Sequence, residues 1–391
     1  MCESTFTINS ITHAYYFGGI FGSLFTARIP DLYGRKVPFV ALLAAQLPCY
    51  IGLVCSRSLL LSVVLSLLMG IVNAGIYNGG YINVCEYVHS PFKIHVCTLL
   101  LVMDNFTVVL VCLYFKYVSR YWLWFQILGI LMNAVALVGI LMIPESPEYL
   151  YSFYRFDECR AVLQRIAQWN NRAFPEHLEF DVEADLKNII FVERVAVADS
   201  PKSYRVSIEK KEKHQQSIKI QRSIKAGLKE FVASPEPLVR NLLMSLPIWA
   251  IVLMIYQINA YYDNYFPGDS YENLMYITLV EFVGYIVADL LFERVGRRAA
   301  AKLYCLGFSI SLICSLGILF NNDEVHPYLD LTFTYCCKFG IAIAFQAAFW
   351  ATNVLFPIIF ASTTFGLCDM MGTISCFFSV DVYTLPNENT Q

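Results

Sequence analysis

The stretch Pro144-Glu145-Ser146-Pro147-Glu148-Tyr149-Leu150 separates two unlike kinds of sequence. Long apolar runs precede it, and a long charged segment follows it before the apolar runs resume. Pro144 has no backbone N–H to donate, and Pro147 disfavours a helical conformation at Ser146. A helix that ends at Ile143 would therefore stop here. The stretch predicts the point at which the chain leaves a lipid bilayer for water.

The composition also favours a membrane protein. Of the 391 residues, 57% are hydrophobic and 15% are charged, whereas a soluble domain carries about 25% charged residues. So much apolar surface cannot be hidden inside a water-soluble core, which predicts an all-α integral membrane protein with the bilayer as its surroundings. The net charge of −3 is small and does not favour nucleic acid as a partner.

The 13 cysteines do not predict a metal site. Most of them lie in apolar runs, where cysteine behaves as a small hydrophobic residue. The pair Cys336-Cys337 lacks the second spaced pair that a zinc site needs. The chain also has no phosphate-binding loop. We therefore expect no metal, no cofactor and no coupling to ATP.

The apolar runs predict about ten membrane-spanning helices, each close to the ~20 residues that a hydrocarbon core requires. The first is the weakest, because His13 and a glycine-rich face lower its hydrophobicity. Two helical halves, residues 1–143 and 240–391, would flank a cytoplasmic central segment, residues 144–239. The expected spans are residues 11–28, 37–55, 59–82, 95–117, 121–143, 240–262, 272–291, 299–320, 329–353 and 362–382.

Lysine and arginine indicate the orientation of these spans. One set of loops is basic, and the opposite set holds fewer basic residues together with acidic tips. Because cytoplasmic loops carry the excess of lysine and arginine, the basic set is expected in the cytoplasm and both termini outside. The basic residues of the short cytoplasmic loops are Arg28, Arg35, Lys36, Lys93, Arg294, Arg297, Arg298 and Lys302.

The central segment cannot span a membrane, since it contains 15 of the 28 lysines and arginines. Cys159, Val162, Leu163 and Ile166 follow the spacing of an amphipathic helix. Residues 199–216 are polar and predict disorder. Residues 217–231 predict a second amphipathic helix on an anionic membrane surface, with a solvated charged linker as an equal alternative.

Two loops of the chain repeat one pattern of an acid, two residues, glycine and two bases. The first is Asp31-Leu32-Tyr33-Gly34-Arg35-Lys36, and the second is Glu293-Arg294-Val295-Gly296-Arg297-Arg298. Glycine permits a sharp turn, and the acid can face either a helix N-terminus or the following bases. Equivalent loops in two halves are typical of transporters built from related halves. The alternative is that both loops are ordinary basic membrane anchors.

With these motifs the chain resembles the major facilitator superfamily, and more narrowly its organic cation/anion (solute carrier) transporters. The resemblance implies a fold of two helical bundles, and it runs from that family's second helix to its eleventh, so that the first and last of the usual twelve appear to be absent. It also implies transport of a small organic ion by alternating access, in a multi-pass protein of the plasma membrane. The oligomeric state is left open.

The same resemblance implies which residues hold the cytoplasmic side closed. The Pro-Glu-Ser-Pro motif of the family matches at Glu145, while its usual Arg-Trp pair is Glu148-Tyr149 here. Glu86 and Lys93 resemble a second latch, whose C-terminal counterpart has lost both charges, at Val354 and Ala361. The residues carried over to the repeated loops are Asp31, Gly34, Arg35 and Lys36, then Glu293, Arg294, Gly296, Arg297 and Arg298.

Ionisable residues inside spans are functional hypotheses by default, because each costs at least ~2.5 kcal/mol at a helix centre. Asp369 resembles the residue that faces the substrate in the cation-selective branch of the family. A desolvated carboxylate attracts an ammonium group, and aromatic faces such as those of Tyr256 and Tyr262 assist it. The alternative for Asp369 is a buried ion pair with Lys338.

Three further charged residues in the spans are candidates. Lys338 could hold an anionic substrate or neutralise Asp369, and Glu281 could bind a cation or exchange a proton. Asp104 could be a cavity residue or a polar contact between helices, and the structural role is preferred for both Glu281 and Asp104.

The sequence thus predicts a transporter for a small organic ion, cationic rather than anionic, and not an enzyme. One alternative is a truncated, non-transporting membrane relative that binds a partner or senses a ligand. A second is a sugar-porter-like carrier, which the sequence matches less well because the span 240–262 holds only one glutamine, Gln257.

Overall fold

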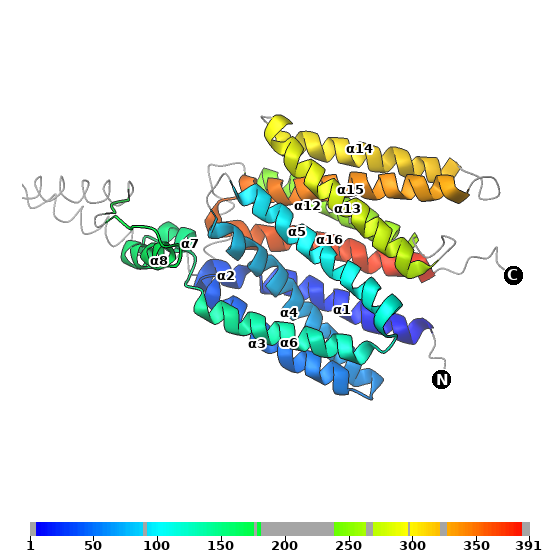
Figure 1. Cartoon of the computed structure of the whole chain (residues 1–391), viewed down its shortest axis with the longest axis horizontal. Helices are drawn as coiled ribbons and strands as arrows, with labels where there is room; N and C mark the ends of the chain where they lie inside the picture. Colours follow the sequence, from blue (N-terminus) through cyan, green and yellow to red (C-terminus); the bar gives the residue numbers. More distant parts are fainter. Residues whose placement is uncertain are drawn as a thin grey trace, which may run out of the picture.

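The computed structural model of the chain describes residues 5–88, 92–175, 178–180, 238–262, 269–295, 298–320 and 327–384. This described part contains helices and no β-strand. Its ten long helices form one bundle-like body (Figure 1). They are α1 (Thr5–Phe25), α3 (Lys36–Cys55), α4 (Leu59–Glu86), α5 (Lys93–Leu113), α6 (Trp122–Met142), α12 (Leu238–Tyr262), α13 (Ser270–Val295), α14 (Ala299–Phe320), α15 (Pro327–Leu355) and α16 (Ala361–Thr384).

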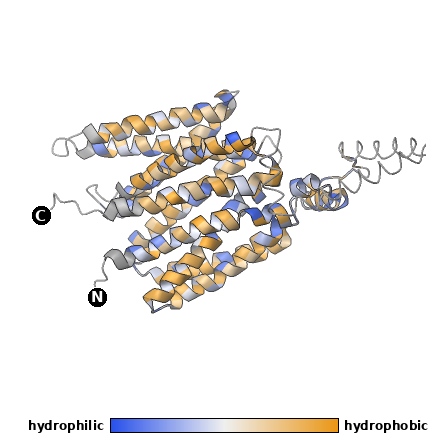
Figure 2. Ribbon diagram, turned by 180° about the vertical axis from the view of Figure 1, so that it is seen from behind, coloured by the Kyte–Doolittle hydropathy of each residue, from blue (hydrophilic) through white to orange (hydrophobic). Residues whose placement is uncertain are grey.

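Nine of these helices are long and apolar enough to cross a membrane, and α1 is not among them. Hydrophobic residues dominate the helices of the bundle, whereas the two short helices beyond it are more polar (Figure 2). On α6, large apolar side chains such as Leu131, Val135 and Val138 are exposed. Such a surface is unfavourable in water and suits lipid. The chain is an all-α integral membrane protein, as expected.

The helices pack in two groups that meet along a seam. In the first group, α4 contacts α1, α3 and α5, and α6 packs on α3. In the second, α15 contacts α12, α13 and α14, and α16 packs on α12. The groups meet mainly where α1 lies against α16 and where α5 lies against α13. This is the two-bundle arrangement that the sequence predicted.

The prolines of the Pro-Glu-Ser-Pro motif end a membrane helix, as predicted. Helix α6 stops at Met142, and α7 (Pro147–Ser152) begins three residues after Pro144. The Ser146 hydroxyl caps α7 by accepting a hydrogen bond from the Tyr149 N–H at 3.1 Å, and proline is favourable at the first helical position.

The amphipathic helix predicted after this motif is present as α8 (Phe156–Trp169). Its Cys159 is buried against α7, with Val162 and Leu163 packed beside it. Both short helices lie beyond one end of the bundle (Figure 1). The predicted disorder at 199–216 and the second amphipathic helix at 217–231 fall outside the described residues.

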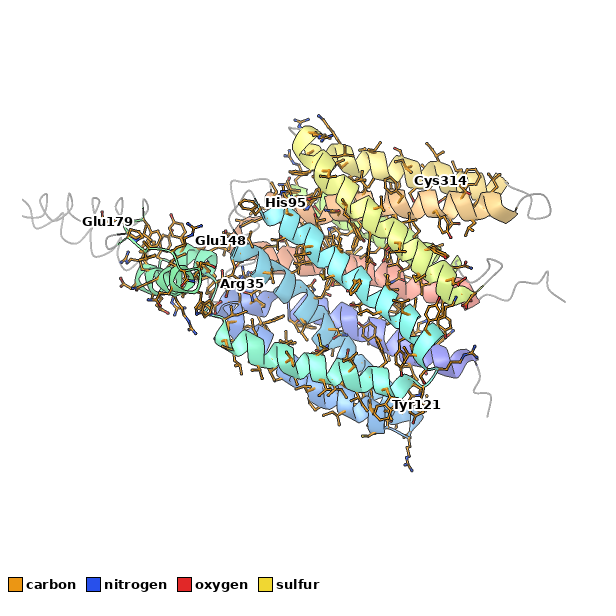
Figure 3. All side chains as sticks on the ribbon, in the orientation of Figure 1. Arg35, His95, Tyr121, Glu148, Glu179 and Cys314 are labelled. Carbon is orange, nitrogen blue, oxygen red and sulfur yellow. The ribbon has the colours of Figure 1, made fainter. Side chains whose placement is uncertain are left out.

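We call the bundle end that adjoins α7 and α8 the basic end, because it carries Arg28, Arg35, Lys36 and Lys93. Helix α1 begins and α16 ends at the opposite end (Figure 1). Arg35 lies at the basic end and Tyr121 at the opposite end (Figure 3).

The segment expected as a tight loop contains a short helix, α2 (Arg28–Tyr33), with Asp31 inside it. Gly34 follows with φ of +100°, a conformation that favours glycine. A Cβ atom at Gly34 would also lie 2.4 Å from a carboxylate oxygen of Glu145. Gly34 therefore allows the carboxylate of the Pro-Glu-Ser-Pro motif to approach the backbone.

Helices α1 and α4 approach closely because Gly18 and Gly70 lack side chains. A Cβ atom at Gly70 would lie 2.0 Å from the Tyr15 carbonyl oxygen. We expect Gly70→Ala to destabilise the fold by about 1–3 kcal/mol, because overpacking forces the two backbones apart. The melting temperature of purified protein in detergent measures this effect and should fall by several degrees.

The matched control is Gly129→Ala on α6, where no atom lies within 4 Å of the added Cβ. This control should melt at or slightly above the temperature of the unmodified chain, since alanine favours helix. Equal melting temperatures for the two variants would contradict the close approach of α1 and α4.

Candidate functional site

A cavity of about 540 Å³ lies between the two groups of helices. Seven helices contribute to its wall, three from the first group (α1, α4 and α5) and four from the second (α12, α13, α15 and α16). Aromatic rings make up much of this wall. The aromatic lining residues are Tyr15, Tyr16, Tyr77, Trp249, Tyr256, Tyr285 and Phe345.

Asp369 lines this cavity from α16. Its Oδ2 atom accepts hydrogen bonds from the Ser23 hydroxyl at 2.6 Å and from the Asn78 side-chain amide at 3.1 Å. Ser23 lies on α1 and Asn78 on α4, so this carboxylate joins the two groups of helices. Lys338 does not contact it in the structure. The ion pair between Asp369 and Lys338, which the sequence left open, is therefore not formed.

Asp104 lines the same cavity from α5. No described residue donates a hydrogen bond to its carboxylate or forms an ion pair with it. The sequence favoured a contact between helices for this residue, and that interpretation is wrong. The hydropathy pattern of α5 could not distinguish a wall residue from a residue between helices, because both positions face away from lipid.

Lys338 and Glu281 form a buried pair with each other behind the wall. The Lys338 Nζ atom lies 3.4 Å from Glu281 Oε1, and neither side chain lines the cavity. Tyr256 stands between this pair and the cavity. Its hydroxyl donates to Glu281 Oε2 at 3.0 Å, and Lys338 Nζ lies 4.9 Å from its ring centre. Direct substrate contact by Lys338 or Glu281, as the sequence proposed, does not fit this arrangement.

The charges around the cavity are therefore unbalanced. Among the described lining residues there are two carboxylates and no lysine, arginine or histidine. The side chain of Tyr262, the other aromatic candidate, lies outside the described part of the structure. Within that described part, no group of three or more His, Cys, Asp and Glu side chains could hold a metal ion.

A buried network closes the basic end, and Arg35 is at its centre. Its guanidinium donates to Glu86 Oε1 at 2.9 Å and to Asp31 Oδ1 at 2.5 Å. Burial by itself lowers the pKa of Arg35, but the Glu86 and Asp31 carboxylates outweigh burial and raise its pKa above the usual range. The guanidinium therefore stays charged at any physiological pH.

The network crosses from one group of helices to the other. Arg35 also donates to the Ile358 carbonyl oxygen at 2.8 Å and to the Ser362 hydroxyl at 3.0 Å. Asp31 accepts from the backbone N–H groups of Ser362 at 3.2 Å and Thr363 at 2.8 Å, in the first turn of α16. A carboxylate at a helix N-terminus is favourable, because unpaired N–H groups point at it.

This contact explains how the basic end closes without the charges that the family has near residues 354–361. The backbone N–H groups of Ser362 and Thr363 and the Ile358 carbonyl oxygen make contacts there in place of charged side chains. The sequence Ser-Thr-Thr at 362–364, which is typical of a helix start, could have indicated this contact. The sequence analysis did not use it.

Glu145 holds the start of α3 in this network. Its Oε1 atom accepts from the backbone N–H groups of Arg35 at 2.8 Å and Lys36 at 3.2 Å. Glu86 and Lys93, the two residues assigned to a second latch, each pair with another residue at the basic end. Glu86 pairs with Arg35, and Lys93 pairs with Glu148 at 2.6 Å. Glu148 stands where the family usually has arginine. Because Glu148 pairs with Lys93, an acid at this position is favourable.

The second repeated loop lies largely outside the described residues. This applies to Gly296, Arg297 and the side chain of Glu293, while Arg294 and Arg298 are exposed. At the same end of the bundle, His95 on α5 contacts Asp289 on α13 at 2.7 Å, which adds a link between the two groups (Figure 3).

The opposite end of the bundle is joined by ion pairs at its surface. Lys116 lies 3.3 Å from Asp269 and also pairs with Glu272 at the start of α13. The Tyr271 N–H and Lys116 lower the pKa of Asp269. The two acidic side chains are each 41% exposed, whereas Arg35 and its carboxylate partners are almost fully buried. Surface ion pairs are weak compared with such a buried network.

A cavity between two helical bundles, with polar contacts joining the bundles at both ends, is the arrangement found in membrane transporters. The chain belongs to the Major Facilitator Superfamily, whose family model matches residues 3–380.

Curated relatives include solute carrier family 22 member 1 from Bos taurus, 26% identical over 391 residues. That alignment covers 96% of this chain and 61% of the relative. Organic cation/carnitine transporter 2 from Homo sapiens is 22% identical, with 97% and 62% covered. The chain thus spans about three fifths of the length of these relatives.

Solved structures share the fold at low sequence identity. The proton:xylose symporter XylE bound to 6-bromo-6-deoxy-D-glucose is 12% identical, with a TM-score of 0.68 over 97% of this chain and 79% of that one. The human organic anion transporter MFSD10 is 15% identical, with a TM-score of 0.57 over 95% and 76%. At these identities the likeness shows the fold alone.

Proposed function

We propose that the chain carries a small organic cation across its membrane by alternating access. The observation that carries this proposal is the cavity wall, whose described residues include two carboxylates and seven aromatic rings and no basic residue. An ammonium group gains attraction from a poorly solvated carboxylate and from aromatic faces. The same wall disfavours an anion, and names of the relatives such as organic cation/carnitine transporter 2 agree with this chemistry.

Helix α16 couples the cavity to the closed end during the alternating movement, because it contributes residues to both. In its first turn, the backbone N–H groups of Ser362 and Thr363 donate hydrogen bonds to Asp31. Asp369, which lines the cavity, lies six residues after Thr363. Six helical residues span about 9 Å. A ligand that changes the hydrogen bonds of Asp369 therefore acts on the helix that completes the basic-end network.

We propose that the structure corresponds to the state closed on the cytoplasmic side, with the basic end in the cytoplasm. The buried Arg35 network holds this end, whereas the ion pairs described at the other end, from Lys116 to Asp269 and Glu272, lie at the surface. Opening to the outside would then require less free energy than opening to the cytoplasm. The plasma membrane remains the predicted location.

The test is uptake by liposomes that contain the purified chain. We expect saturable uptake of radiolabelled tetraethylammonium, faster with an inside-negative potential, and little uptake of benzoate or glucose. Empty liposomes are the control for leakage. Glucose uptake would favour the sugar-carrier alternative. Binding of tetraethylammonium without uptake, by folded protein, would contradict transport and favour the sensing alternative.

A further inference from the structure

The charges at the cavity leave an excess of two negative charges. Asp104, Asp369 and Glu281 are acidic, and Lys338 is basic. Lys338 Nζ lies 3.4 Å from Glu281 Oε1, so this lysine balances the charge of Glu281. Asp104 has no partner among the described residues, and Asp369 is held only by the neutral side chains of Ser23 and Asn78. Two uncompensated charges inside a membrane protein are costly unless a ligand or a bound proton balances them.

The two free carboxylates face one continuous cavity. Both Asp104 and Asp369 are lining residues of the same space of about 540 Å³. Both also act electrostatically on the same two phenols, Tyr15 and Tyr77. Aromatic walls therefore lie close to both acids. Such walls suit methylene groups by their apolar faces and ammonium groups by cation–π attraction.

An inorganic cation at Asp104 is the competing way to balance the charge. A site for a hard cation needs several oxygen ligands. Within the described residues, no cluster of acidic, histidine or cysteine side chains could hold a metal ion, and Asp104 forms no such group with a neighbour. One ligand that reaches both carboxylates fits the cavity better.

We infer that the substrate is an organic dication, such as a linear aliphatic diamine, with one ammonium group at Asp369 and the other at Asp104. This inference rests on the proposed function of the cavity and goes beyond it by naming two binding carboxylates and a substrate with two charges. Asp104 would set the preference for the second charge.

The experiment compares two probes of equal chain length, 1,5-diaminopentane and 1-aminopentane, by titration calorimetry on the purified chain. We expect the diamine to bind at least about tenfold more tightly, since one desolvated ion pair readily contributes a factor of ten. Asp104→Asn should reduce the ratio of the two affinities to about one. Asp104→Glu, which keeps the charge, should retain the preference and shows that the site still folds.

The control variant is Asp157→Asn, which removes a fully accessible acid on α8 and should keep the ratio of the unmodified chain. Equal binding of the two amines by the unmodified chain would overturn the inference and leave the proposed function intact. A preference that persists in Asp104→Asn would overturn the role of Asp104. Failure of both amines to bind folded protein would overturn the inference and the proposed function together.

Discussion

Replacing Asp369 with asparagine should lower cation binding and uptake by about 100-fold. The substitution keeps the shape of the side chain and removes its charge. Loss of one partner from a buried charged contact costs about 2–5 kcal/mol, and each 1.4 kcal/mol is a factor of ten. Uptake of tetraethylammonium and its affinity in detergent both measure this effect.

The melting temperature of the same variant should not fall with its uptake. Without a ligand, Asp369 is a carboxylate in a membrane helix that has only neutral partners, Ser23 and Asn78. Removing that charge should leave the melting temperature unchanged or raise it. A loss of uptake with retained melting temperature is therefore the expected combination.

Ser23→Ala is the matched control for Asp369→Asn, because it removes one hydrogen bond to the carboxylate and keeps the charge. It also keeps the hydrogen bond from Asn78, so it should lower affinity by no more than about tenfold, which corresponds to about 1.4 kcal/mol. If Asp369→Asn retains full uptake, the cavity does not bind its substrate through this residue.

Replacing Arg35 with alanine should open the basic end. The variant would leave Glu86 buried without its cation and Asp31 with only the more distant Arg28, at 3.7 Å. Breaking a buried ion pair in this way costs about 3–5 kcal/mol. It would also remove the contacts from Arg35 to Ile358 and Ser362. The equilibrium should therefore shift toward states in which the start of α16 has moved away.

Two native cysteines report this opening. Cys85 and Cys97 line a small cavity at the basic end, and their side chains are buried. In Arg35→Ala, both should react faster with a maleimide added from the cytoplasmic side, and mass spectrometry of the labelled peptides identifies them. The rate should rise at least about tenfold if the closed state loses 1.4 kcal/mol or more of its stability.

Arg155→Ala is the matched control, since Arg155 forms an exposed pair with Glu158 on α8 at the same end. It should leave the labelling rate unchanged. Arg35→Lys should behave like Arg35→Ala, because a lysine cannot reproduce the forked contacts of a guanidinium. Unchanged labelling in both Arg35 variants would show that this network does not close the basic end.

The sequence predicted the parts of the fold that depend on local properties. A helix of about 20 apolar residues is set by the thickness of the hydrocarbon core, so the spans could be placed from hydropathy. The end of α6 followed from Pro144 and Pro147, and α8 followed from the spacing of Cys159, Val162 and Leu163. The acid of the first repeated loop was expected to face either a helix N-terminus or the following bases, and Asp31 contacts both the start of α16 and Arg35.

Only the tertiary structure decided which charges pair. Arg35 pairs with Glu86, Lys93 with Glu148 and Lys338 with Glu281, and the sequence predicted none of these three pairs. Such pairs depend on how each helix is rotated about its axis and which helix it faces. Hydropathy does not encode that rotation when the residues lie far apart in the chain. For the same reason, only the structure decided between the two roles considered for Asp104 and placed it in the cavity wall. It alone showed that the described lining residues include two acids and no base.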